Sequence, residues 1–190
     1  MKQSEINRAW QEAGDCFART GWALPPEPRW DITDFGLGRF AEAGLVLINL
    51  AEEPEYCEKL MWCRHQQQTP MHCHRAKKED IICRWGRLAI ELWAGDPRET
   101  PQGRIFTLKR SGREFEVRSG EILLLNPGER VTLVPGVWHA FWADSDECVI
   151  GEVSTANDDT SDNFFVDPDI GRFPLVESDE PPALKLISQP

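Results

Sequence analysis

Short runs of β-branched, aliphatic and aromatic residues, separated at short intervals by glycine or proline, fill the chain between residues 45 and 153. Such runs, bounded by turn-forming residues, are typical of β-strands, and many of them in succession predict a sandwich or a barrel. The strands that we expect are 45–50, 56–64, 81–84, 87–93, 104–108, 115–117, 121–125, 130–134, 139–142 and 148–153. The pattern therefore predicts an all-β fold.

The N-terminal residues follow a different period. Apolar residues recur there at spacings of three and four, and they are Ile6, Ala9, Trp10, Ala13 and Phe17. This spacing predicts an amphipathic α-helix over residues 3–19, which ends near Gly21. We expect its apolar face to pack against the outside of the barrel.

Length and charge narrow the class of function. With 190 residues, 41% of them hydrophobic, we expect one domain over residues 1–190. Within this domain we expect a helix in residues 1–25, a barrel in residues 40–155, and a C-terminal loop and tail in residues 156–190 that pack on the barrel. The net charge of -11 disfavours nucleic acid and anionic membranes as partners, so a small ligand is expected.

Apolar runs and cysteine spacing bear on the compartment. We find neither a run of about eighteen apolar residues nor a hydrophobic signal core at the N-terminus. The six cysteines form no Cys-x-x-Cys pair and are interpreted as free thiols. These features predict a cytoplasmic protein.

Three of the four histidines fall in a pattern of metal ligands. His72 and His74 are two residues apart, which places both imidazoles on one face of a strand and Cys73 on the other. Glu79 follows after a short turn and His139 lies in a later expected strand, so two antiparallel strands could bring all four together. Three imidazoles and a carboxylate suit Mn, Fe, Co, Ni or Zn with open coordination positions, and ligand type does not choose among them.

The spacing of these ligands resembles a known family of barrels. His72-x-His74-x4-Glu79-x6-Gly86, with Pro135-Gly136-x-x-His139, is similar to the two signatures of the cupin superfamily. This resemblance implies a double-stranded β-helix (jelly-roll) barrel. Further segments extend the resemblance to the D-lyxose ketol-isomerase family of small, manganese-dependent cupins, over nearly the whole chain. These segments are 30–36 (Trp-Asp-Ile-Thr-Asp-Phe-Gly), 70–82, 151–163 and 171–174 before the acidic run 177–180.

The resemblance implies a metal-dependent aldose–ketose isomerase. It would act through an enediol on a free pentose or hexose, such as D-lyxose/D-xylulose or D-mannose/D-fructose, with Mn²⁺ as the implied metal. Such a reaction needs a general base. We expect Glu152 in this role, because its strand otherwise consists of core residues.

Further residues are expected around the substrate. The resemblance singles out Lys77, which could pair with the developing oxyanion or carry a proton between O1 and O2, whereas strand alternation should turn Lys78 away. It also singles out Asp162. Trp138, beside His139, could pack on the sugar, and Arg172 could reach it from the tail. Small cupins often pair, so we expect a homodimer.

Two other functions stay open at this point. Three histidines and a glutamate around Fe(II) also suit O₂ chemistry, so a cupin dioxygenase is the first alternative. A cupin that binds a sugar or metabolite without turnover is the second. Metal identity and oxygen consumption would separate the dioxygenase from the isomerase, and formation of a ketose would separate the isomerase from the binding protein.

Overall fold

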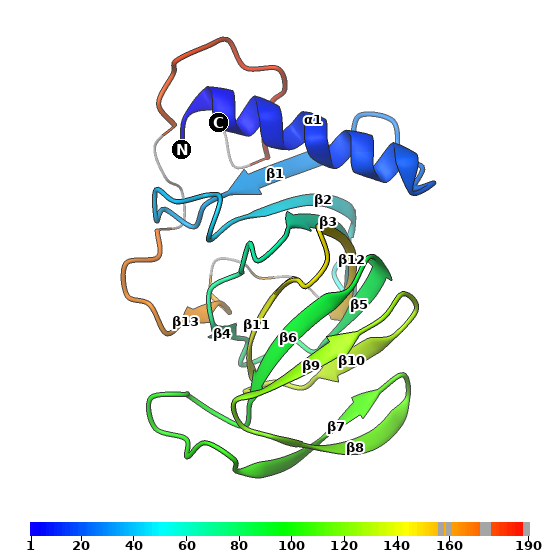
Figure 1. The fold of residues 1–190 in the computed structure, drawn as a ribbon, viewed down its shortest axis with the longest axis vertical. Helices are drawn as coiled ribbons and strands as arrows, with labels where there is room; N and C mark the ends of the chain where they lie inside the picture. The colour runs from blue at the N-terminus through cyan, green and yellow to red at the C-terminus, as the bar shows by residue number, and fades with distance from the viewer. Residues whose placement is uncertain (156–157, 159–160, 172–175, 188–190) are drawn as a thin grey trace.

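The computed structural model describes residues 1–155, 158, 161–171 and 176–187. Helix α1 (Gln3–Arg19) is followed by β-structure (Figure 1). The strands are β1 (Arg29–Thr33), β2 (Leu45–Glu52), β3 (Tyr56–Arg64), β4 (His72–Cys73), β5 (Glu79–Trp85), β6 (Leu88–Trp93), β7 (Ile105–Arg110), β8 (Arg113–Arg118), β9 (Glu121–Leu125), β10 (Arg130–Leu133), β11 (Trp138–Ala143), β12 (Glu147–Thr155) and β13 (Phe164–Phe165).

Two antiparallel sheets form the body of the molecule. The eight-stranded sheet runs in the order β1-β2-β3-β12-β5-β10-β7-β8, and the five-stranded sheet runs β13-β4-β11-β6-β9. Neighbours in both orders are mostly far apart in sequence, as in β12, which pairs with β3 on one side and β5 on the other. The all-β fold with an N-terminal helix, expected from the sequence, is confirmed.

Helix α1 covers the outer face of the eight-stranded sheet (Figure 1). Its buried face, which includes Ile6, Ala13 and Phe17, packs with Trp62 of β3 and Val149 of β12. The three- and four-residue spacing of its apolar positions is what lets a single face be buried. The expected bounds and packing of the helix are both confirmed.

The inward-facing side chains of the eight-stranded sheet change from apolar to polar along its central strands. Cys63 and Met61 of β3 belong to the core between the sheets, and the next residue on that face is Lys59. Strand β12 repeats the pattern, with Ile150 in the core and Glu152 beyond it. Because alternate residues share a face, each strand adds one polar group to the same end of the barrel. That end holds a cavity, and the other end is a packed core.

The C-terminal region packs on the barrel in the parts that are described. Strand β13 pairs with β4. Leu186 is buried, and Ile187 donates a backbone hydrogen bond to Trp30 O (2.9 Å). Figure 1 shows this last segment crossing near helix α1. No helix among the described residues is long and apolar enough to cross a membrane.

Candidate active site

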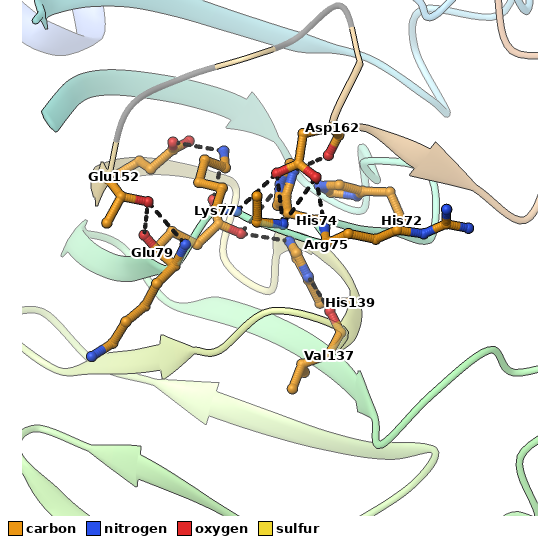
Figure 2. Close-up of polar contacts among 12 residues, drawn as sticks. His72, His74, Arg75, Lys77, Glu79, Val137, His139, Glu152 and Asp162 are labelled. Carbon is orange, nitrogen blue, oxygen red and sulfur yellow. Dashed lines mark hydrogen bonds and ion pairs between the residues drawn. The ribbon is translucent and has the colours of Figure 1, made fainter. Parts of the chain in front are cut away.

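Three imidazoles converge between the two sheets. Pairing of β4 with β11 places His139 directly opposite His72, with ring centroids 4.2 Å apart. His74 follows the end of β4, and its ring centroid is 5.3 Å from that of His72. One ligand nitrogen from each of the three histidines lies within 4.8 Å of the other two (Figure 2). These nitrogens could hold a metal ion.

The Nδ1 atom of each ring faces a backbone carbonyl oxygen. Because a carbonyl oxygen can only accept a hydrogen bond, each Nδ1 carries the proton and each Nε2 keeps a lone pair. Partners of this kind orient histidine side chains that bind metals. The three contacts are His72 to Pro70 O at 2.8 Å, His74 to Asp162 O at 2.8 Å and His139 to Val137 O at 3.3 Å.

Glu79, the first residue of β5, adds a carboxylate to this group. Its Oε1 is 3.1 Å from His139 Nε2 and 3.5 Å from His74 Nε2. Among the described residues, neither Glu79 Oε1 nor His139 Nε2 has a hydrogen-bond partner, although both are buried. With only Nδ1 protonated, the two atoms are acceptors that face each other, which is unfavourable unless a proton or a metal cation lies between them. This donor set therefore fits a divalent metal ion.

The surroundings keep these groups in the protonation states that bind metals. Burial lowers the pKa of His72 well below its ordinary value, and the nearby His139 and His74 rings lower it further. Burial also lowers the pKa of His74. Burial alone would raise the pKa of Glu79, but the Lys77 ammonium and the His139 and His74 side chains together outweigh it and hold this pKa well below its ordinary value. Neutral imidazoles at His72 and His74 and an ionised Glu79 carboxylate result, and these are the forms that bind metals.

Next to these groups lies a cluster of four buried charges, which we call the charge cluster. Its members are Lys59, Lys77, Glu79 and Glu152, each at most 5% exposed. Lys77 Nζ is 2.8 Å from Glu79 Oε2 and 3.0 Å from Glu152 Oε1 (Figure 2). Lys59 Nζ is 3.7 Å from the same Glu152 oxygen. Pairing of two cations with two anions is what makes such burial tolerable.

Lys77 joins the proposed metal ligands to the charge cluster. Burial alone would lower the pKa of Lys77, but the carboxylates of Glu79 and Glu152 raise it above its ordinary value. Lys77 is therefore an ammonium group at neutral pH, which can donate hydrogen bonds and cannot act as a base. Lys78, expected to turn away, is exposed.

Asp162 holds the turn that carries Lys77. Its carboxylate accepts hydrogen bonds from the backbone N–H groups of Arg75 (2.8 Å), Ala76 (3.0 Å) and Lys77 (2.8 Å). Burial alone would raise the pKa of Asp162, but these backbone donors lower it. Asp162 does not line the cavity. The carboxylate that we expected among the catalytic residues thus contacts backbone in this structure.

The cavity at this end of the barrel has a volume of about 320 Å³. Its charged wall carries the histidines and the charge cluster. Its remaining wall is largely apolar and includes Leu47, Met61, Phe141 and Phe165. One charged wall and one apolar wall suit a small polar molecule whose reactive end must be held in a fixed orientation.

Of the two residues that we expected at the substrate, only Trp138 falls among the described residues. Trp138 does not line the cavity, because it neighbours His139 on β11 and successive side chains of a strand point to opposite faces. The aromatic residues at the cavity are instead Phe35, Phe141 and Phe165. Arg172 lies outside the described residues.

Sequence reasoning missed Lys59. It lies within a strand whose inward positions continue with Met61 and Cys63, and a lysine in that series is unusual for a core. This was a usable signal. Its meaning depends on β12, which brings Glu152 directly opposite Lys59.

Comparisons with known proteins agree with this geometry. A family model described as D-lyxose isomerase matches residues 27–189. The D-lyxose/D-mannose isomerase of Escherichia coli O157:H7 is 40% identical over 192 residues, which cover 95% of this chain and 80% of that protein. The D-lyxose ketol-isomerase of Cohnella laeviribosi is 29% identical over 188 residues, which cover 95% of this chain and 100% of that protein.

Solved structures extend the likeness of the fold. L-ribose isomerase of Cellulomonas parahominis, solved with L-ribose, has a TM-score of 0.67 at 17% identity, covering 90% of this chain and 94% of that one. L-ribose isomerase of Acinetobacter sp. DL28, also solved with L-ribose, has a TM-score of 0.67 at 16% identity with the same coverage. At such low identity the likeness concerns the fold.

Proposed function

Because the chain belongs to the D-lyxose isomerase family and is an aldose–ketose isomerase, we propose that its substrates are D-lyxose and D-mannose, converted to D-xylulose and D-fructose. Each reaction moves a hydrogen from C2 to C1 without net oxidation or reduction. The barrier is the low acidity of the C2–H bond. A suitable site must therefore supply a base and stabilise an enediol.

We assign His72, His74, Glu79 and His139 as ligands of a divalent metal ion, with manganese as the first choice. The observation that carries this assignment is the Glu79 Oε1 atom, buried without a hydrogen bond and facing the Nε2 atoms of His74 and His139. When bound there, the ion would act as a Lewis acid toward the sugar carbonyl and its neighbouring hydroxyl, which is worth several kcal/mol.

Glu152 is the proposed general base. It would take the proton from C2 of the aldose and return it to C1, and the reverse reaction would use the same oxygen. Strand β12 lies inside the eight-stranded sheet, so Glu152 is fixed on both sides by neighbouring strands. A base in such a position typically contributes about 10²–10⁴-fold to the rate.

Lys77 is the proposed hydrogen-bond donor to the sugar oxygen on which negative charge develops. Its raised pKa favours this role over carrying a proton between O1 and O2, because a shuttle must release its proton. Its contact with Glu152 at 3.0 Å places donor and base side by side. Lys59 would support the base from the opposite strand.

The test combines metal analysis with turnover. Purified protein is assayed for bound metal and then incubated with D-lyxose or D-mannose in D₂O, with metal-stripped protein and manganese-restored protein as controls. We expect D-xylulose and D-fructose to form only with metal, with no consumption of O₂. Metal-loaded protein that forms neither ketose would contradict the proposal, and O₂ consumption would favour the dioxygenase. Cytoplasmic location and pairing of two copies stay predictions.

A further inference from the structure

Phe35 occupies the side of the cavity away from the proposed base. The cavity extends across the eight-stranded sheet from Glu152 on β12, past β3 and β2, to β1. Strands β1 and β13 are the end strands of their sheets, so the cavity would be open on this side. Phe35, which follows β1, meets Phe165 of β13 with ring centroids 6.4 Å apart. This pair closes the gap between the two sheets.

The backbone of Phe35 adopts a left-handed conformation, with φ of 55°. Bulky residues rarely do so, and strain of this kind persists only where the surroundings enforce it. Phe35 N donates to Thr33 Oγ1 (2.9 Å), and Phe35 O accepts from Gly171 N (2.9 Å). A Cβ atom at Gly36 would lie 3.0 Å from Gly171 N, so the close approach of the two segments favours glycine at position 36.

The buried carboxylate of Asp34 also holds this turn. Its two carboxylate oxygens accept hydrogen bonds from Gly36 N (2.9 Å) and Gly38 N (3.0 Å). Phe35 itself is only partly buried, and its ring packs against the core between the sheets. These contacts hold the strained backbone of Phe35 and thereby fix the position of its ring at the cavity wall.

Resting on the proposed function, we propose that Phe35 determines how large a sugar the cavity accepts, by contacting the end of the substrate remote from C1 and C2. Its neighbour Phe165 packs against His72 with the two rings tilted and their centroids 5.6 Å apart, so this wall is continuous with the proposed metal ligands. A sugar held at C1 and C2 between His72 and Glu152 must direct its other carbons within the space that the phenylalanine pair bounds. Aromatic rings suit this contact, because sugars present apolar C–H faces.

D-lyxose and D-mannose are matched probes of this wall. D-mannose has the configuration of D-lyxose at C2, C3 and C4 and carries one further carbon at the remote end. Pockets discriminate by roughly 10- to 200-fold for one methylene group. Removal of the Phe35 ring should therefore favour the hexose selectively.

The experiment compares wild type, Phe35→Ala and Phe35→Gly. Glycine removes the ring and also adopts a positive φ without strain, so it serves if the alanine variant folds poorly. We expect the ratio of kcat/KM for D-mannose to that for D-lyxose to rise about 10-fold in both variants. Phe115→Ala is the matched control: Phe115 is also partly buried against the core and does not line the cavity, so the ratio should stay unchanged.

A binding measurement separates this inference from the proposed function. D-mannitol and D-arabinitol, the reduced forms of the two sugars, bind without turnover and can be titrated by calorimetry. We expect their relative affinity to shift toward D-mannitol in both Phe35 variants. Folded variants in which neither this ratio nor the kcat/KM ratio changes would overturn the role of Phe35. Failure of wild type to convert either sugar would instead overturn the proposed function.

Discussion

Lys59 and Glu152 lie directly opposite each other on the adjacent strands β3 and β12, with Lys59 Nζ 3.7 Å from Glu152 Oε1. Both are 5% exposed, and Lys77 contacts the same oxygen. The proposed base is thus held by cations from two directions, one from the neighbouring strand and one from the turn before β5. Loss of any member should unbalance the charge cluster.

Lys59→Met should destabilise the protein by about 3 kcal/mol, because it leaves a buried carboxylate with one cation fewer. Combining it with Glu152→Gln should restore part of this loss, with a coupling free energy of about 1–3 kcal/mol between the two positions. Urea denaturation of the wild type, both single variants and the double variant measures this coupling. If the two single effects simply add, Lys59 does not stabilise Glu152.

Glu152→Gln should lower kcat by about 10²–10⁴-fold, since glutamine keeps the shape of the side chain and cannot accept the C2 proton. Metal content should not change, because Glu152 is not among the proposed ligands. The measurement is turnover of D-lyxose together with metal analysis. Glu116→Gln, which alters an exposed glutamate on β8, is the control and should leave kcat unchanged. Activity near that of wild type in the Glu152 variant would remove Glu152 from the base position.

Regular elements could be predicted from local patterns alone. The expected helix over residues 3–19 and the expected strands 56–64 and 121–125 match α1, β3 and β9 to the residue. Strand β13 has only two residues and carries no period to recognise, so its pairing with β4 could not be foreseen. Such short strands exist because a partner strand supplies hydrogen bonds.

The candidate site, too, could be predicted only in part from the sequence. The spacing of His72 and His74 pointed to a shared site because local geometry brings residues two apart together, even though β4 ends at Cys73. The roles of Lys59 and Phe35 could not be assigned from the sequence, because their partners come from the distant β12 and β13. Adjacency to His139 was a poor guide for Trp138, since neighbours on a strand point to opposite faces.

Metal removal should lower the midpoint of thermal unfolding, because an ion that binds only the folded state stabilises it. At a free metal concentration 100 times the dissociation constant, this stabilisation is about 2.7 kcal/mol. Chelation of the wild type should therefore shift the melting temperature down, and His139→Ala should abolish the shift. His65→Ala, which changes the exposed fourth histidine, should leave it intact. Equal shifts in the two histidine variants would argue against a metal at His139.

Asp162→Asn should destabilise the protein by about 2 kcal/mol at neutral pH, because asparagine lacks the negative charge and one of the two acceptor oxygens that bind the 75–77 turn. The effect should depend on pH with a definite sign. The folded-state pKa of Asp162 lies below its ordinary value, so the stabilisation is complete above the unfolded pKa of about 3.9. It is lost as the pH falls through the folded pKa.

The difference in unfolding free energy between wild type and Asp162→Asn should therefore stay constant from neutral pH to about pH 5 and shrink below that. Urea denaturation across this pH range measures the difference. Asp158→Asn is the control, because Asp158 is an exposed carboxylate nearby that accepts a hydrogen bond from Ser161 N. Its substitution should cost less at every pH. A difference for Asp162 that persists unchanged at acidic pH would mean that its charge does not stabilise the turn.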